Sequence, residues 1–159
     1  MKQTKQTGFT LIELIIVMVI LGIMAAVAVP RYLNSIANAE EAAENAVISN
    51  IMAGLKQYAN NQFYTNGRAV WPDNPLSDKV LSEPLENYDA TDDGQQGDIE
   101  NFDGVADKDG EWTFDIINSK ITHQRSDNTR YSWAYNKGVQ TGDLAAIGTL
   151  GERDTIPNN

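Results

Sequence analysis

An uninterrupted apolar stretch near the N-terminus constrains this chain more than any other feature. The residues from Phe9 to Val29 carry one charge, the carboxylate of Glu13. As a helix the stretch is about 31 Å long at 1.5 Å per residue, roughly the thickness of the hydrocarbon core of a bilayer. Lys2 and Lys5 precede it without any acidic residue, as is typical of a cytoplasmic flank. The pattern predicts one membrane-spanning helix with its N-terminus in the cytoplasm.

Two simpler interpretations explain this stretch less well. A secretory signal peptide has a shorter apolar core and a small-residue cleavage site, whereas here the run is long and contains Glu13. A plain membrane anchor accounts for the length and the lysines but not for Glu13. A charged residue at the centre of a membrane helix costs roughly 2.5–3.5 kcal/mol on insertion scales, and less near an end. An ionisable group in a membrane segment therefore predicts a functional partner.

The stretch GFTLIELIIVMVILGIMAAVAVPRY, residues 8–32, resembles the N-terminus of type IV pilins and the related type II secretion pseudopilins. The resemblance implies that residues 1–8 are a leader peptide, which a prepilin peptidase removes by cutting between Gly8 and Phe9. It also implies that the new N-terminal residue, Phe9, is N-methylated. A residue without a side chain suits the close approach of a protease, which fits Gly8.

The same resemblance gives Glu13 a partner. In this family the equivalent glutamate pairs with the N-terminal amine of a neighbouring subunit, which here is the amine of Phe9 after cleavage. In a medium of low dielectric an unpaired carboxylate and an unpaired ammonium are each costly, and pairing them offsets both costs. The pair is thus expected to set the register between subunits of a homopolymer.

Gly22 and Pro30 qualify the helix predicted over residues 9–30. A proline inside a helix removes a backbone hydrogen bond and clashes with the preceding turn, so we expect a kink or a locally melted segment at Pro30. In filaments of the family, the segment between such a glycine and proline is often unwound. The alternative is that Gly22 only packs closely against a neighbour.

A second helical segment is predicted to follow and to continue the first to about Tyr64. Apolar residues recur there at three- and four-residue steps, and proline is absent until Pro72. The acidic residues of its first half are expected to face solvent or another subunit: Glu40, Glu41 and Glu44. The apolar residues of its second half are expected to lie under a sheet: Val47, Ile51, Leu55 and Tyr58. Residues 31–159 therefore form the globular head, including the second half of the long helix.

Residues 65–88 contain three of the five prolines and predict an ordered loop, with a short helix as an option. Three strands are predicted from alternating patterns separated by turn residues: EWTFDII (111–117), KITHQR (120–125) and RYSWAYN (130–136). They form an antiparallel meander packed on the helix, so the predicted fold class is α+β, the pilin-like arrangement. His123 is expected on the sheet surface without a catalytic role. The Gly-rich tail after residue 137 is weakly patterned, and its end is expected to be mobile.

The composition excludes several functions. The chain has no cysteine and one histidine, which excludes a disulfide scaffold, a thiolate zinc site and a multi-histidine metal site within one chain. A net charge of −10 argues against a phosphate-binding nucleic-acid surface. No arrangement of nucleophile, acid and base typical of an enzyme is visible, so we do not expect an enzyme.

The acidity is concentrated between Glu83 and Asp115, where twelve acidic residues accompany one basic residue, Lys108. Clustered carboxylates repel one another, and calcium with six to eight oxygen ligands would relieve this. Part of the stretch follows the spacing of a calcium-binding loop, but with threonine at its third position and no convincing flanking helices. Major pseudopilins, which this chain resembles, use calcium to order an acidic loop. The candidate ligands are Asp89, Thr91, Asp93 and Glu100, and then Asp103, Asp107 and Asp109. A plain acidic surface loop is the alternative, and no other cofactor is predicted.

The predicted function is that of a non-enzymatic subunit of a type IV pilus-like filament, serving adhesion, motility or DNA uptake. Two alternatives stay open, a major pseudopilin of type II secretion and a membrane-tethered calcium-binding module that does not polymerise. The expected partners are further copies of the chain, a prepilin peptidase, an inner-membrane assembly platform, and minor pilins or pseudopilins. The expected location is the inner membrane before assembly, and an extracellular pilus or periplasmic pseudopilus afterwards.

Overall fold

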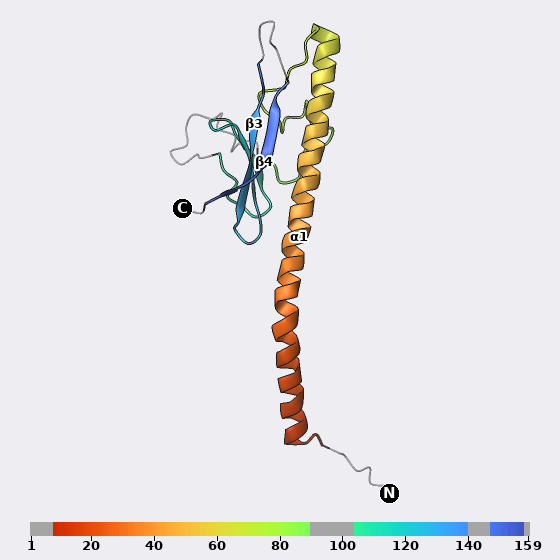
Figure 1. Cartoon of the computed structure of the whole chain (residues 1–159), viewed down its shortest axis with the longest axis vertical. Helices are drawn as coiled ribbons and strands as arrows, with labels where there is room; N and C mark the ends of the chain where they lie inside the picture. Colours follow the sequence, from red (N-terminus) through yellow and green to blue (C-terminus); the bar gives the residue numbers. More distant parts are fainter. Residues whose placement is uncertain (1–7, 90–103, 140–146, 158–159) are drawn as a thin grey trace. The chain divides into compact units, whose positions relative to one another are not determined.

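The structure is a computed structural model that describes residues 8–89, 104–139 and 147–157. Its elements follow one another along the chain as one helix, α1, and four strands, β1 to β4 (Figure 1). The chain divides into two compact units, Met1–Glu44 and Asn45–Asn159. The described elements form an α+β fold with one long N-terminal helix and an antiparallel sheet, as predicted.

Helix α1 spans Leu11–Asn66 and contains Pro30. The helix runs without a break through Gly22 and Pro30, so the single chain has no locally melted segment there, and unwinding in a filament stays a prediction. Proline lacks an N–H group, and the carbonyl of Ala26 therefore has no donor at the usual position four residues on. Long runs of good helix formers on both sides allow the helix to tolerate this missing bond.

The first three strands lie close to the predicted ranges. Strand β1 is Trp112–Asp115, β2 is Lys120–Gln124 and β3 is Arg130–Asn136. Neighbouring strands pair antiparallel, with Phe114 opposite Ile121 and Ile121 opposite Trp133. Period-2 alternation thus gathers the aromatic residues of β1 and β3 on one face of the sheet.

A fourth strand, β4, was not predicted. It spans Thr149–Ile156 and pairs antiparallel with β3, so the sheet order is β1-β2-β3-β4. Its sequence, TLGERDTI, does not alternate apolar with polar residues because β4 is an edge strand in which no residue is buried.

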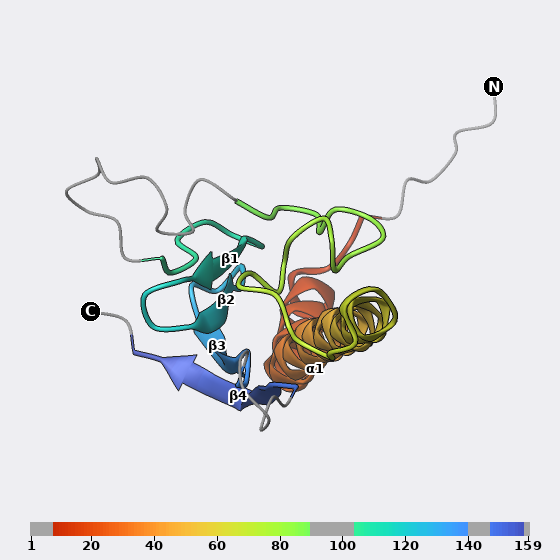
Figure 2. The ribbon, with the colours of Figure 1, turned by 90° about the horizontal axis from the view of Figure 1, so that it is seen from above.

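The hydrophobic core joins the second half of α1 to the sheet. Figure 2 shows the four strands side by side in order, with residues 67–89 running past them. Ile51 and Leu55 are fully buried, and Val47 and Tyr58 are partly buried against the same core, as predicted. Residues 67–89 contain turns and no helix, and they contribute Trp71, Leu76 and Val80 to this core. All three tryptophans of the chain lie within it.

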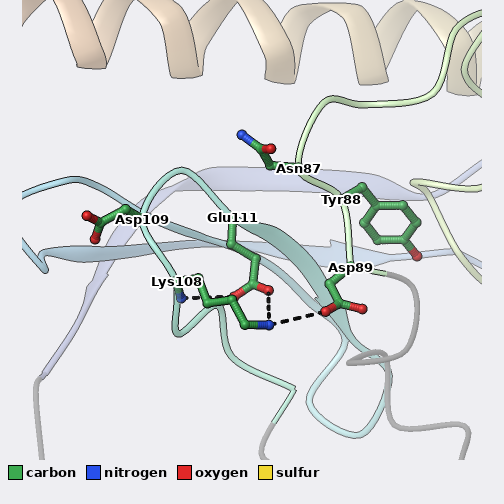
Figure 3. A pocket seen from close by; sticks show the side chains of 6 residues that line it. All are labelled: Asn87, Tyr88, Asp89, Lys108, Asp109 and Glu111. Atoms are coloured by element: carbon green, nitrogen blue, oxygen red, sulfur yellow. Dashed lines mark hydrogen bonds and ion pairs between the residues drawn. The ribbon is translucent and has the colours of Figure 1, made fainter.

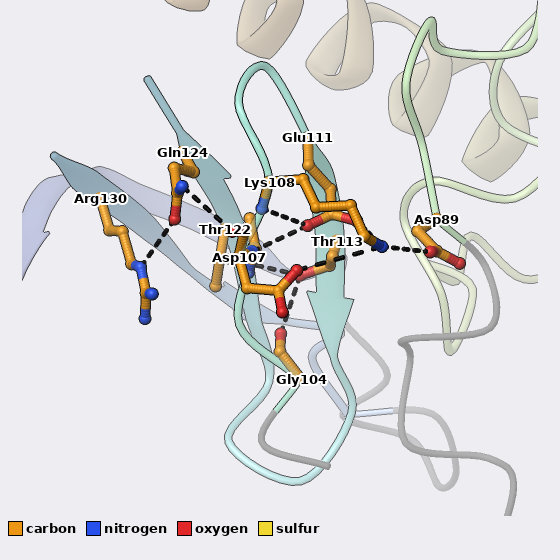
Figure 4. Close-up of polar contacts among 10 residues, drawn as sticks. Asp89, Gly104, Asp107, Lys108, Glu111, Thr113, Thr122, Gln124 and Arg130 are labelled. Atoms are coloured by element: carbon orange, nitrogen blue, oxygen red, sulfur yellow. Dashed lines mark hydrogen bonds and ion pairs between the residues drawn. The ribbon is translucent and has the colours of Figure 1, made fainter. Parts of the chain in front are cut away.

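The opposite face of the sheet is closed by the segment before β1. Thr113 donates its hydroxyl hydrogen bond to the carbonyl of Gly104 at 2.8 Å, and the N–H of Ala106 donates to the hydroxyl of Thr122 at 2.8 Å (Figure 4). The two threonine hydroxyls also lie 2.6 Å apart. Buried hydroxyls that are paired in this way avoid the cost of lost hydration.

Two expectations about polar residues are wrong. Glu44 is 1% exposed, although it was expected to face solvent or another subunit. His123 is buried rather than on the sheet surface. Its ring stacks on Trp112 with centroids 4.2 Å apart, and its Nδ1 lies 2.9 Å from the carbonyl oxygen of Glu111. The residues against His123 lie in β1 and just before it, and this pairing is not revealed by a local pattern.

Candidate functional site

The start of α1 contains a reciprocal hydrogen-bonded cap built by Thr10 and Glu13. The backbone N–H of Thr10 donates to Glu13 Oε2 at 2.8 Å, and the Thr10 hydroxyl donates to the same oxygen at 2.7 Å. The Thr10 oxygen in turn accepts from the N–H of Glu13 at 3.4 Å. This is a capping box, which satisfies backbone N–H groups that have no partner within the helix. The carboxylate of Glu13 is therefore held in a defined position at the helix start.

Gly8 and Phe9 precede this cap and are exposed. A side-chain carbon added at Gly8 would meet nothing within 4 Å, and Phe9 is 89% exposed. The bond between them is thus sterically open within the described chain. Cleavage at this bond and methylation of Phe9 stay predictions.

The apolar stretch is not covered by any other described part of the chain. Every residue from Gly8 to Ala39 is exposed in the part of the chain that the structure describes. The helix that contains it is long and apolar enough to cross a membrane. Gly22 meets no other atom within 4 Å of an added side-chain carbon, so its close-packing role would require another copy or lipid.

The second candidate region surrounds Lys108. The Lys108 ammonium lies 3.3 Å from Glu111 Oε1 and 3.4 Å from Asp89 Oδ2 (Figure 3). These residues line an open cavity of about 310 Å³ together with Asn87, Tyr88 and Asp109. The hydrogen bond to Glu111 and the attraction of its charge raise the pKa of Lys108, with a further contribution from Asp89.

The described candidate calcium ligands do not assemble into a metal site. Asp89 contacts Lys108, Asp107 lies 4.0 Å from the same ammonium, and the side chain of Asp109 points away from it (Figure 3). Among residues 8–89, 104–139 and 147–157 no group of three or more acidic or histidine side chains is placed to hold a metal ion. Thr91, Asp93, Glu100 and Asp103 lie outside the described residues. A calcium site that includes any of these seven residues therefore stays a prediction.

Three residues of these sites were not among the predicted ones. Thr10 forms the T-x-x-E pattern with Glu13, and this capping-box signature was readable in the sequence. Lys108 stood out as a lone basic residue, but its partners did not. Glu111, whose side chain is 5% exposed, carried no sequence signal that separated it from the neighbouring acids.

Known proteins match this chain in a short N-terminal motif and, more widely, over about half of its length. Residues 3–29 match the Prokaryotic N-terminal methylation motif. The chain is 41% identical over 81 residues to the Type IV major pilin protein PilE1 of Neisseria gonorrhoeae, which is 51% of this chain and 46% of that protein. It is 42% identical over 79 residues to a Fimbrial protein of Neisseria meningitidis, 50% of this chain and 43% of that protein.

A secretion protein is also similar. The Type II secretion system core protein G of Vibrio cholerae is 46% identical over 52 residues, 33% of this chain and 34% of that protein. The chain thus spans less than half the length of these curated relatives. No solved structure matches. The N-terminal methylation motif and these relatives together support the family predicted from the sequence, that of the type IV pilins and type II secretion pseudopilins.

Proposed function

We propose that this chain is a structural subunit of a type IV pilus-like extracellular filament, acting in adhesion, motility or DNA uptake. The observation that carries the proposal is the exposed apolar stretch Phe9–Val29 with a single carboxylate, Glu13, at its start. Such a surface is stable in lipid, or against other copies of itself, and not in water. Relatives named as type IV major pilins support the same conclusion.

The mechanism is the bundling of N-terminal helices. Before assembly the apolar stretch lies in the inner membrane, and after assembly it lies in the filament interior. Removal of residues 1–8 by a prepilin peptidase creates an amine at Phe9. In the filament the Glu13 carboxylate of one copy pairs with the Phe9 amine of the next. A stagger that leaves either charge unpaired in an apolar interior is penalised, and the pair therefore selects one register.

The pairing is tested by Glu13→Gln, which keeps the shape and an oxygen for Thr10 but removes the charge. We expect the variant to be cut and inserted normally. Filament yield should fall more than about tenfold, because an unpaired buried charge costs roughly 3–5 kcal/mol. Sheared filaments are quantified by electron microscopy and immunoblotting. Glu40→Gln, in the same helix but outside the apolar stretch, is the matched control and should assemble normally. Wild-type filament yield from Glu13→Gln would remove the proposed role of the charge.

Processing is tested separately by Gly8→Val. A branched side chain at the residue before the cut should block access of the peptidase to the bond. The precursor is then expected to accumulate at full length, and the leader is followed by mass spectrometry. Recovery of a mature chain that begins at Phe9 would count against this cleavage site.

A second candidate function is that of a pseudopilus subunit in type II secretion. The 46% identity to a core protein G over 52 residues favours it. Deletion of the gene distinguishes the two. Loss of surface filaments with intact secretion supports the pilus, and loss of secretion without surface filaments supports the pseudopilus. A membrane-tethered protein that never polymerises would be absent from sheared filaments altogether.

A further inference from the structure

Lys108 lies among three carboxylates that come from two separate segments. Its Nζ is 3.3 Å from Glu111, 3.4 Å from Asp89 and 4.0 Å from Asp107 (Figures 3 and 4). It is also the single basic residue between Glu83 and Asp115. The positive charge of the most acidic part of the chain is thus located at one point.

Glu111 ties this charge to the backbone of its own turn. One oxygen, Oε1, accepts a hydrogen bond from the Lys108 ammonium. The other, Oε2, accepts the backbone N–H groups of Asp107 at 2.7 Å and Lys108 at 3.0 Å (Figure 4). The Glu111 side chain is 5% exposed, so its bonds to the backbone N–H groups form away from bulk water and are stronger than exposed ones, whereas the Lys108 side chain is 68% exposed. Both oxygens of Glu111 are therefore occupied by groups of this chain.

Asp89 is held in place by backbone hydrogen bonds to β1. Its N–H donates to the carbonyl of Trp112 at 3.1 Å, and the N–H of Trp112 donates to the carbonyl of Asn87 at 3.1 Å. These bonds accompany a parallel bridge between Tyr88 and Trp112. The segment 87–89 thus runs beside the start of β1, with the Asp89 carboxylate directed at Lys108 (Figure 3).

We propose that Lys108 is a built-in counter-ion that ties residues 87–89 to the turn 104–111 and replaces a divalent cation there. From the turn, its ammonium reaches the carboxylate of Asp89, which lies 19 residues earlier in the sequence. A calcium ion at the same place would need six to eight oxygens and would be repelled by the ammonium. Bringing residues 89 and 108 together costs the chain between them conformational entropy. The bonds made by Lys108 offset part of that cost.

The test uses the full chain in detergent micelles and follows unfolding of the head by tryptophan fluorescence. EDTA should leave the melting temperature of the wild type within about 1 °C of its value in millimolar calcium. Lys108→Met, which keeps the length of the side chain and removes its charge, should lower the melting temperature by about 2–5 °C with or without calcium, if one or two charge-assisted bonds are lost. Lys108→Arg should retain most of the wild-type value.

The matched control is Lys137→Met. Lys137 pairs with Asp73 at 2.5 Å, and both side chains are exposed. Its removal should change the melting temperature by less than about 1 °C, since neither member of this pair is buried, whereas Glu111, the partner of Lys108, is buried. Faster hydrogen exchange at the amides of Asp107 and Lys108 in Lys108→Met supports the tie directly.

Two results would overturn the proposal. One is a wild-type protein that loses several degrees on chelation, since a bound cation would then hold the region. The other is a Lys108→Met variant that melts with the wild type and keeps its exchange rates. Neither result bears on filament formation, so this inference and the proposed function fail independently.

Discussion

Gly54 lies where α1 meets the loop before the sheet. A side-chain carbon added there would overlap the carbonyl oxygen of Val80 and lie 3.0 Å from Val80 Cγ1. Alanine normally favours a helix over glycine by about 1 kcal/mol. Here the clash is with backbone, which cannot rotate away, and overpacking of this kind costs about 1–3 kcal/mol. The close approach of α1 to this loop therefore requires glycine.

We expect Gly54→Ala to lower the melting temperature of the head by about 2–5 °C, the net of these two effects. The measurement is thermal unfolding of the full chain in detergent by tryptophan fluorescence. Gly22→Ala, in the same helix, is the control, because an added carbon at Gly22 meets nothing within 4 Å. Equal or higher stability of Gly54→Ala would show that the loop moves aside at little cost.

The pH dependence of the Lys108 tie follows from its raised pKa. Hydrogen bonding to Glu111 raises the pKa of Lys108 above its ordinary value of about 10.5. A group whose pKa is higher in the folded state contributes stability that is fully present below the unfolded value and is lost as pH rises through the folded value. The melting temperatures of wild type and Lys108→Met should thus differ by a constant amount from neutral pH to about pH 10 and converge above it. Convergence near neutral pH would contradict the assignment.

The sequence pattern predicted some residues of these sites and not others. Glu13 stood out because a charge inside an apolar stretch is costly, and Lys108 stood out because it is alone among acids. The partners of Lys108 did not stand out, since Asp89 reaches it across 19 residues. Glu44 and His123 were also misplaced. The burial of His123 depends on its contacts with Trp112 and Glu111, which its own strand pattern does not reveal.

At the scale of elements, the chain that enters β4 passes close to the end of β3. A side-chain carbon added to Gly148 would overlap the carbonyl oxygen of Asn136 and approach the ring of Trp71. Asn136 pairs with Thr149 at the first rung of the β3–β4 ladder. A larger residue at Gly148 should therefore push β4 away from β3 at this end.

Gly148→Ala is expected to destabilise the head by about 2–3 kcal/mol, at the upper part of the range for overpacking. Gly151→Ala, three residues later and within β4, is the control, because its added carbon would lie 3.3 Å from Ala134 Cβ and needs only a small adjustment. Chemical denaturation gives the free energies, and hydrogen exchange along β4 locates the effect. The same loss in both variants would mean that β4 is sensitive to any side chain rather than to this contact.

The elements that the sequence predicted are those with a strong period. Strands β1 to β3 alternate apolar and polar residues between turn residues, and the second half of α1 repeats its apolar residues every three to four positions. Strand β4 lacks such a period because neither of its faces is fully buried. It forms because β3 offers an unpaired row of N–H and C=O groups, which is a property of the sheet and not of the β4 sequence.

On the scale of the whole molecule, the exposed apolar stretch should be covered in every physiological state. The chain has no native cysteine, so a single introduced cysteine reports the exposure of its own position. We expect Met18→Cys to react much more slowly with a charged thiol reagent than Lys79→Cys, both in membranes and in filaments. Both side chains are exposed in the isolated chain, and the difference must come from lipid or from other copies. Equal labelling of the two in isolated filaments would argue against helix bundling.

The proline within α1 has a mechanical consequence. Because Pro30 has no N–H, the helix lacks the hydrogen bond from position 30 to the carbonyl of Ala26. Gly22 lies one turn before Ala26, and glycine has the weakest preference for a helix after proline. A fibre pulled along its length yields first where the fewest bonds resist extension. If these helices bundle as proposed, elasticity would reside in the segment between Gly22 and Pro30, and the sheet with its buried tryptophans would keep its form under load.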